Sequence, residues 1–257
     1  MLEFCDRYHF DGVDSKFLTS AWEPRANVSR VDWEHPSTCS NGENYVKLLD
    51  DVRSALRSPQ YLLTSALPVG EYCLRSIDLK AASALLDYIN LMGYDFTGHW
   101  TDVSGHHAQL FPPSQNLSHV YPTLRKSCSG GVEYALRHGI PPQKILLGVP
   151  AYARYFPQAR GPGQPFRQAG EIEYCDIPDE WIQSARIHEE SGAASHVDLS
   201  DGKGFASFDV PRTVEIKVQY VKKQGLGGLF YWTGVGDRKG EGSLIAAGNR
   251  ALKDGPG

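Results

Sequence analysis

Two short acidic segments near the start of the chain carry the residue types that acid–base catalysis needs. The first reads DGVD over residues 11–14 and the second reads VDWE over residues 31–34. Joined, they give DGVDVDWE, in which Asp14, Asp32 and Glu34 occupy every second position. Side chains at alternate positions of a strand point to one face, so this pattern gathers three carboxyl groups. Crowding raises one pKa, and we expect Glu34 to stay protonated as a general acid near neutral pH.

Polar and aromatic residues also stand at the ends of three later apolar runs. Tyr94 and Asp95 follow the first, Tyr152 and Arg154 follow the second, and Trp232 closes the third. One such pair alone is more often a strand-end hydrogen bond than a site. In a βα barrel, functional groups lie at the C-terminal ends of the strands, so the three together predict a ligand cleft.

Strands must position these side chains, and the chain supplies short apolar runs between amphipathic stretches. The predicted strands cover residues 61–67, 88–92, 144–149 and 228–232. Strands that are buried on both faces and alternate with helices indicate parallel βα units and an α/β fold. The spacing alone leaves a closed barrel and an open doubly wound sheet as alternatives.

The helices between these strands are predicted from apolar residues three to four apart. One helix is predicted around residues 46–56, and a second around residues 214–221 that ends at Gly225. Ser243 is the predicted N-cap of a last helix that runs through Leu252.

Composition excludes several classes of protein. The chain has 257 residues, enough for one large domain or two small ones. The net charge of −4 leaves no basic surface for phosphates, so nucleic acid is not an expected partner. No apolar run approaches the roughly 20 residues that a membrane helix needs. The chain also opens without the basic and apolar regions of a signal peptide.

Neither a metal nor a cofactor is predicted. The 5 cysteines contain no CxxC pair, and their odd number leaves a thiol free or paired between chains. His99, His106 and His107 have no carboxylate or cysteine at ligand spacing.

The motifs together resemble those of family 18 glycoside hydrolases, the chitinases. The joined acidic segment matches the family signature DGxDxDxE. Residues 92–95, MGYD, match its MxYD strand end, and residues 148–154, GVPAYAR, match its GxPxYxR strand. Residues 225–228, GLGG, followed by Trp232 match the final strand. The resemblance covers residues 4–252, nearly the whole chain.

This resemblance implies hydrolysis of β-1,4-linked N-acetylglucosamine polymers with retention of configuration. Glu34 would protonate the glycosidic oxygen. Asp32 would orient the N-acetyl group of the substrate, whose carbonyl oxygen attacks C1 in place of an enzyme nucleophile. Asp14 would complete the acidic set, Tyr94 would bind the acetamido group, and Asp95 would hold the distorted sugar.

The remaining site residues would bind the substrate. By resemblance, Trp232 would stack beneath the sugar, and Met92, Tyr152 and Arg154 would line the cleft. The resemblance also implies a monomer, outside the cell or in the cell wall, that acts on chitin or chito-oligosaccharides without a cofactor.

The start of the chain departs from the family pattern. The family places three βα units before the acidic motif, whereas only about ten residues precede it here. We therefore expect residues 1–257 to be one partial catalytic domain, N-terminally truncated. It would hold strands four to eight of a (β/α)8 TIM barrel with their helices.

Residues 15–30 interrupt the acidic motif. They can be encoded with a splice donor, GTAAGT, at Ser15–Phe17 and an AG acceptor across Arg30–Val31. A retained intron is the favoured interpretation, and a genuine loop insertion that breaks the catalytic strand is the alternative. Residues 155–205 are also longer than an ordinary βα loop, so we expect an extended loop there, with Trp181 in packing and a shallow cleft.

Two other functions stay open. A chitinase-like lectin would bind the polymer without cleaving it, but such relatives usually lose the acid, and Glu34 is present. An inactive truncated fragment is the second alternative, and the missing strands favour it.

Overall fold

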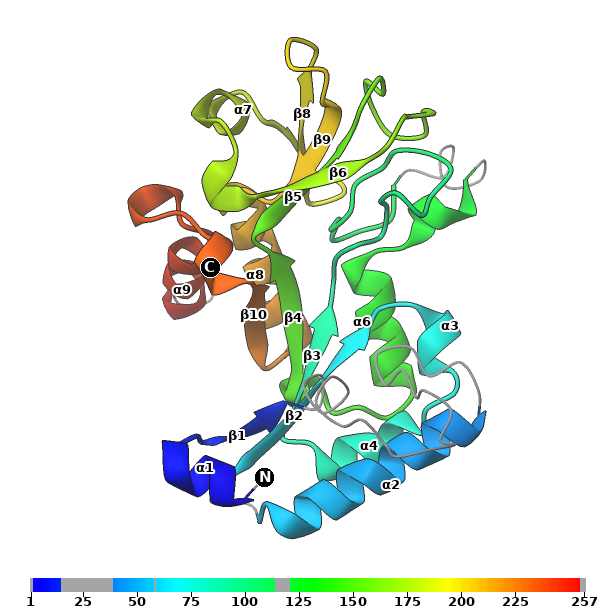
Figure 1. Ribbon diagram of the computed structural model, residues 1–257, viewed down its shortest axis with the longest axis vertical. Coiled ribbons are helices and arrows are strands. Elements are labelled where there is room, and N and C mark those ends of the chain that lie inside the picture. Colours follow the sequence, from blue (N-terminus) through cyan, green and yellow to red (C-terminus); the bar gives the residue numbers. More distant parts are fainter. Residues whose placement is uncertain (1, 15–38, 58, 114–120, 255–257) are drawn as a thin grey trace. The chain divides into compact units, whose positions relative to one another are not determined.

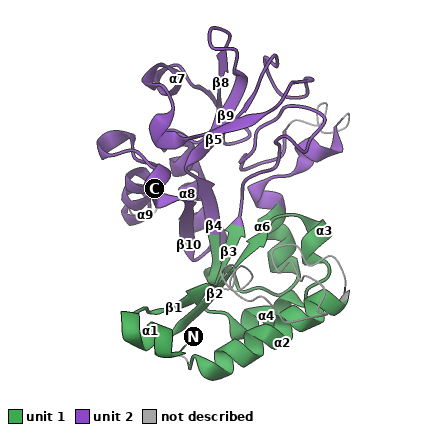
Figure 2. Ribbon diagram, in the orientation of Figure 1, with its two compact units in different colours: residues 1–91, 131–146 green, residues 92–130, 147–257 purple. Residues whose placement is uncertain are grey.

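The computed structural model describes residues 2–14, 39–57, 59–113 and 121–254 (Figure 1). Asp32, Glu34 and the interruption at residues 15–30 lie outside these ranges. The chain divides into two compact units (Figure 2). The first consists of residues 1–91 and 131–146, and the second of residues 92–130 and 147–257.

Helices and strands alternate through most of the chain. The α-helices are α1 (Leu2–Tyr8), α2 (Cys39–Ala55), α3 (Glu71–Leu74), α4 (Leu79–Leu85), α6 (Cys128–Arg137), α7 (Asp179–Gln183), α8 (Pro211–Gln224) and α9 (Leu244–Lys253). The strands are β1 (Gly12–Asp14), β2 (Leu62–Pro68), β3 (Tyr88–Met92), β4 (Ile145–Pro150), β5 (Tyr152–Phe156), β6 (Gly170–Glu173), β7 (Arg186–His188), β8 (Ala193–Asp198), β9 (Gly204–Phe208) and β10 (Gly228–Trp232). No helix within the described ranges has the length and apolar composition of a bilayer-spanning segment.

One sheet carries the strands predicted from the apolar runs. Its strand order is β1-β2-β3-β4-β10, so the strands follow one another as they do along the chain. β1 and β2 pair in parallel, with Gly12 opposite Leu62 and Asp14 opposite Thr64. Strands β3 and β10 have the predicted bounds, and β2 and β4 each lie one residue further along. The predicted α/β class, with parallel strands in chain order, is confirmed.

In the first unit, helix α2 packs through an apolar face that includes the predicted Leu49 and Val52, with Tyr45 buried in place of the expected Val46. Tyr45, Leu49, Val52 and Leu56 recur at helical spacing and are at most 2 % exposed. The hydroxyl of Tyr45 lies 2.5 Å from that of Ser65 in β2, so the one polar atom of this face has a partner.

Arg53 ties the C-terminal end of α2 to segments that follow it in the sequence. Its guanidinium donates to the carbonyl oxygens of Leu56, Tyr61 and Leu85, at 2.9–3.1 Å. It also pairs with Asp87 Oδ2 at 2.5 Å, and the same carboxylate oxygen accepts the backbone N–H of Leu63. One side chain thereby satisfies carbonyl groups at the helix end and on the segments before β2 and β3.

The second unit contains a sheet that differs from the loop expected over residues 155–205. Strands β6-β5-β9-β8-β7 form this sheet, and the four neighbouring pairs are antiparallel. The expectation of an extended loop was therefore wrong. The strands have only three to six residues each and lie between Gly- and Pro-rich turns, which obscures their alternation. Trp181 is 5 % exposed in the core beside this sheet, as predicted.

Helices α8 and α9 complete the second unit. Helix α8 ends before Gly225, whose φ of 65° is left-handed, and the Ser243 hydroxyl caps α9 by accepting the Ala246 N–H; both features were predicted. Lys217 of α8 is fully buried, with Nζ 2.5 Å from Asp209 Oδ2. Thr213 donates to the other carboxylate oxygen of Asp209 at 2.7 Å, so this buried charge is well solvated by the protein.

Replacing Lys217 by Met keeps the side-chain length but leaves Asp209 buried without its cation. Removing one member of a buried ion pair costs about 3–5 kcal/mol, and we expect the free energy of unfolding to fall by that amount. Arg212→Met is the control, because the ion pair of Arg212 with Glu189 is exposed and worth at most about 1 kcal/mol. Urea unfolding followed by circular dichroism measures both; equal losses would contradict the prediction.

Candidate functional site

Asp95 is the centre of a polar cluster in the second unit. It follows the C-terminal end of β3, and its Oδ1 accepts from Tyr152 Oη and from Arg154 Nε, both at 2.9 Å. Arg154 Nη2 lies 2.9 Å from the same oxygen. The other terminal nitrogen of Arg154 pairs with Glu171 of β6 at 2.9 Å. Among the described residues, Tyr152 and Arg154 thus direct all their hydrogen bonds with this carboxylate to Oδ1.

The electrostatics of the cluster keep Asp95 ionised. Burial disfavours the charge, but the nearby His107 ring and the Arg154 guanidinium outweigh it and lower the pKa of Asp95 to about 2. Burial, together with the carboxylate, raises the pKa of Tyr152, which therefore stays a neutral O–H donor. The cluster holds a fixed negative charge next to aromatic surface.

The local sequence explains how Asp95 is presented. A Cβ at Gly93 would lie 2.8 Å from Cys128 Sγ, so the close approach of α6 requires glycine there. The Cys128 thiol donates to the Gly93 carbonyl at 3.2 Å, and burial raises its pKa to about 11. Asp95 itself has φ 59°, a left-handed conformation that turns the chain out of the strand.

Strand alternation brings the partners of Asp95 to it. Tyr152 and Arg154 are two residues apart on β5 and share a face. The Arg154 guanidinium also lies over the ring of Trp100, 4.9 Å from its centroid. Glu171, Trp100 and His107 were not predicted as site residues. Glu171 is revealed only by the strand register, which places it opposite Arg154.

Tyr94 packs beside the Asp95 cluster, and the backbone of Trp232 is hydrogen-bonded to the residue that precedes β5. The Tyr94 ring is 7 % exposed and contacts the rings of Tyr152 and Phe230, at 6.1 and 6.2 Å. Trp232 is two residues beyond Phe230, its carbonyl accepts the Ala151 N–H at 2.8 Å, and its side chain is 38 % exposed. The structure thus brings together Tyr94, Asp95, Tyr152 and Arg154 beside the end of β10. Met92 is buried at the end of β3.

Of the three alternating carboxyl residues Asp14, Asp32 and Glu34, Asp14 is the one that the described ranges include, and it belongs to the first unit. Its Oδ2 accepts from Thr64 Oγ1 at 2.6 Å and from Asn90 Nδ2 at 2.9 Å. The side chains of β1, β2 and β3 thus form a hydrogen-bonded row that fixes Asp14. The predicted roles of Asp32 and Glu34 fall outside the described residues and stay predictions.

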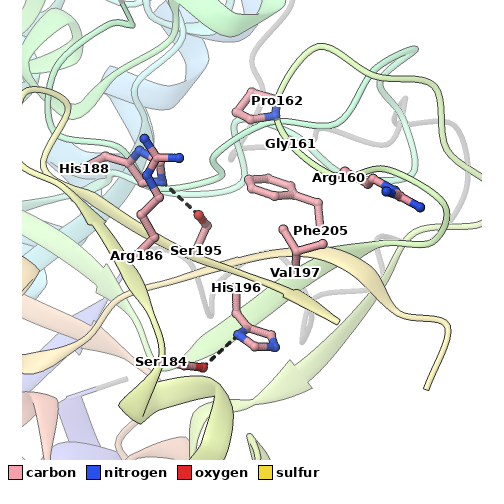
Figure 3. A pocket seen from close by; sticks show the side chains of 10 residues that line it. All are labelled: Arg160, Gly161, Pro162, Ser184, Arg186, His188, Ser195, His196, Val197 and Phe205. Atoms are coloured by element: carbon pink, nitrogen blue, oxygen red, sulfur yellow. Dashed lines mark hydrogen bonds between the residues drawn. The ribbon is translucent and has the colours of Figure 1, made fainter. Parts of the chain in front are cut away.

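A separate pocket is lined by side chains of β7 and β8 and by residues 160–162 (Figure 3). Arg160, Arg186, His188 and Ser195 are among its lining residues, and His188 Nε2 lies 2.8 Å from Ser195 Oγ. None of the predicted site residues lines this pocket. In the described part of the chain, no three His, Cys, Asp or Glu side chains gather as metal ligands would. The Asp95 cluster is therefore the candidate site.

The chain is similar in sequence to known glycosyl hydrolases. The profile of the glycosyl hydrolases family 18 matches residues 1–237. Endochitinase 1 of Metarhizium anisopliae is 32 % identical over 261 residues, which are 95 % of this chain and 56 % of that protein. Chitinase 1 of Aphanocladium album is 30 % identical over 266 residues, 97 % of this chain and 57 % of that protein.

Solved structures agree with the sequence comparison. A family 18 N-acetylglucosaminidase from Paenibacillus barengoltzii superposes with a TM-score of 0.78 at 25 % identity. The match covers 98 % of this chain and 73 % of that one. The chain thus spans about half the length of the curated relatives it matches.

Removing the guanidinium next to Asp95 should shift its titration. In Arg154→Gln we expect the pKa of Asp95 to rise from about 2 toward its ordinary value of 3.8. The lowered pKa stabilises the folded protein above the unfolded value, and this contribution is lost as the pH falls toward 2. A ¹³C NMR titration of the carboxyl group measures the shift. Arg212→Gln is the control and should leave the pKa of Asp95 unchanged. An unchanged pKa of Asp95 in Arg154→Gln would show that Arg154 does not lower it.

Proposed function

The chain belongs to the glycosyl hydrolases family 18, and from this premise we propose that it is a chitinase that hydrolyses β-1,4-linked N-acetylglucosamine polymers. The observation that carries the proposal is the Asp95 cluster. It is an ionised, partly exposed carboxylate beside Tyr94, and both belong to the MxYD match. Relatives named chitinases across nearly the whole chain support the same substrate class.

The cluster suits a neutral sugar that carries an acetamido group. Tyr152 and Arg154 hold Oδ1 of Asp95, so Oδ2 is available to accept from sugar N–H and O–H groups. Tyr94 would bind the acetamido group. The exposed ring of Trp232 offers an apolar face on which the underside of a pyranose can stack.

The chemical step would use the acidic motif. Glu34 would donate its proton to the glycosidic oxygen while the acetamido carbonyl oxygen, oriented by Asp32, attacks C1 from the opposite face. Water would then open the cyclic intermediate, and the two inversions at C1 give overall retention. Asp14, fixed by Thr64 and Asn90, would anchor the start of the acidic row.

The setting of this activity follows the family resemblance. We place the protein outside the cell or in the cell wall, acting as a monomer on chitin or chito-oligosaccharides and without a cofactor. A non-catalytic chitin-binding lectin is the alternative function.

Glu34→Gln tests the acid. The amide fills the same volume but has no acidic proton, so we expect kcat to fall by on the order of 10²–10⁴ with oligosaccharide binding retained. Asp32→Asn should also lower kcat, through a misoriented acetamido group, whereas the exposed Glu43 on α2 provides a neutral control as Glu43→Gln.

The measurements are release from a chromogenic N-acetylglucosamine oligomer and calorimetric binding of the oligomer. An active Glu34→Gln variant would overturn the mechanism. Binding without turnover by the unsubstituted chain would favour the lectin instead.

Deletion of residues 15–30 tests the interruption of the motif. The deletion rejoins DGVD and VDWE, which restores the every-second-position spacing of the three carboxyls. Because misplacing a catalytic group by about 1 Å can cost on the order of 10²-fold, we expect the deletion to raise kcat/KM by at least that factor. The same chromogenic assay decides it. If the full chain, with residues 15–30, is as active as the deletion variant or more active, the segment belongs to the working enzyme.

A further inference from the structure

His107 is a buried imidazole with no hydrogen bond to either nitrogen. Its side chain is 0 % exposed, and neither Nδ1 nor Nε2 has a partner among the described residues. Leaving a buried donor or acceptor unsatisfied costs about 1–3 kcal/mol, so such a group in a folded protein calls for an explanation.

The ring lies directly beside the candidate site. Nδ1 is 3.8 Å from Asp95 Oδ1, and the ring centroid is 5.2 Å from that of Tyr152. The backbone holds it there, because the His107 carbonyl accepts the Phe96 N–H at 3.1 Å and its own N–H donates to Ser207 Oγ at 3.4 Å. Phe96 follows Asp95 in the chain, so this backbone hydrogen bond keeps His107 next to Asp95.

The present geometry explains why the hydrogen bond is not made. Oδ1 already receives donors from Tyr152 Oη and from two nitrogens of Arg154, each at 2.9 Å. A carboxylate oxygen has about two lone-pair positions, so a further donor is kept at a distance. Closing 3.8 Å to hydrogen-bond length needs a shift of only about 1 Å.

The ring is suited to act as a donor without carrying charge. Burial lowers the pKa of His107, and the Asp95 carboxylate only partly opposes this. The Arg154 charge lowers the pKa further, while the Asp209 carboxylate raises it. His107 is therefore a neutral imidazole near pH 7, with one N–H to give.

We propose that His107 is a positioning residue for Asp95, and that its Nδ1–H takes up Oδ1 when the carboxylate turns toward a bound sugar. The turn frees Oδ1 from one of its present donors, and His107 replaces it inside the protein, where a hydrogen bond to a carboxylate is strong. The inference rests on the proposed function, because it requires a sugar at Asp95. Nδ1 of His107, which has no hydrogen bond in the free protein within the described residues, then gains one only in the substrate complex.

Three substitutions separate this role from a purely structural one. Asn places its amide nitrogen where Nδ1 stands, Gln places it nearer Nε2, and Leu has a similar volume with no polar atom. His106→Asn is the matched control, because His106 is also buried but contacts Ser207 and the His188 ring.

We expect His107→Leu and His107→Gln to lower kcat on a chromogenic N-acetylglucosamine oligomer by roughly tenfold or more, with KM within about twofold of the unsubstituted protein. His107→Asn should retain kcat within about threefold, and His106→Asn should keep it. Thermal unfolding supplies the second readout. His107→Leu should unfold at the same or a higher temperature, since an apolar group removes the unsatisfied nitrogens.

The outcomes are distinct. Full kcat in His107→Leu overturns the proposal. A loss shared by Asn, Gln and Leu that follows a fall in unfolding temperature also overturns it, because His107 is then only structural. If the unsubstituted protein neither binds nor cleaves the oligomer, the proposed function itself fails and this inference falls with it.

Discussion

A charged carboxylate inside a protein has to be compensated by nearby donors, and Asp95 imposes this requirement on the second unit. Three donors from Tyr152 and Arg154 converge on Oδ1. Arg154 in turn pairs with Glu171 through its other terminal nitrogen, and its guanidinium lies over the face of Trp100. The end of β3, the face of β5 and the register of β6 are thus tied together by one negative charge.

Buried polar groups fix other junctions in the same way. Asp209 and Lys217 join the segment before α8 to the helix itself, and Arg53 joins α2 to the segments before β2 and β3. Apolar faces bring such elements into contact, but many relative positions bury similar apolar area. Hydrogen bonds with defined geometry select among them, because a misplaced partner leaves a charge or carbonyl unsatisfied.

Satisfied and unsatisfied groups are distributed unevenly around the candidate site. Asp95 has more donors than one oxygen needs, whereas His107, 3.8 Å away, has no hydrogen bond to its ring nitrogens within the described residues. Under the proposed role of His107, a sugar bound at Asp95 brings about the missing hydrogen bond, so the gain in free energy arises only when the sugar is present.

Local pattern was enough for strands β2, β3, β4 and β10, for helices α2, α8 and α9, and for two of the capping residues. The apolar runs determined β3 and β10 to the residue, and Gly225 and Ser243 were identified from the chemistry of helix ends. The motifs around Tyr94, Asp95, Tyr152 and Arg154 indicated the site, because side chains at the C-terminal ends of parallel strands gather on one side of the sheet. The acidic pair Asp32 and Glu34 was likewise found from its spacing, and its placement stays a prediction.

Only the tertiary structure decided which distant segments meet. The antiparallel sheet of residues 152–208 was missed, since strands of three to six residues acquire their pattern from their neighbours rather than from their own sequence. The pairing of Arg154 with Glu171 depends on strand register, and the position of His107 depends on how its loop is anchored to Phe96 and Ser207. The sequence determined secondary structure because periodicity is a local property. Partners of charged and buried polar groups are set by contacts between residues far apart in the chain, which periodicity does not encode.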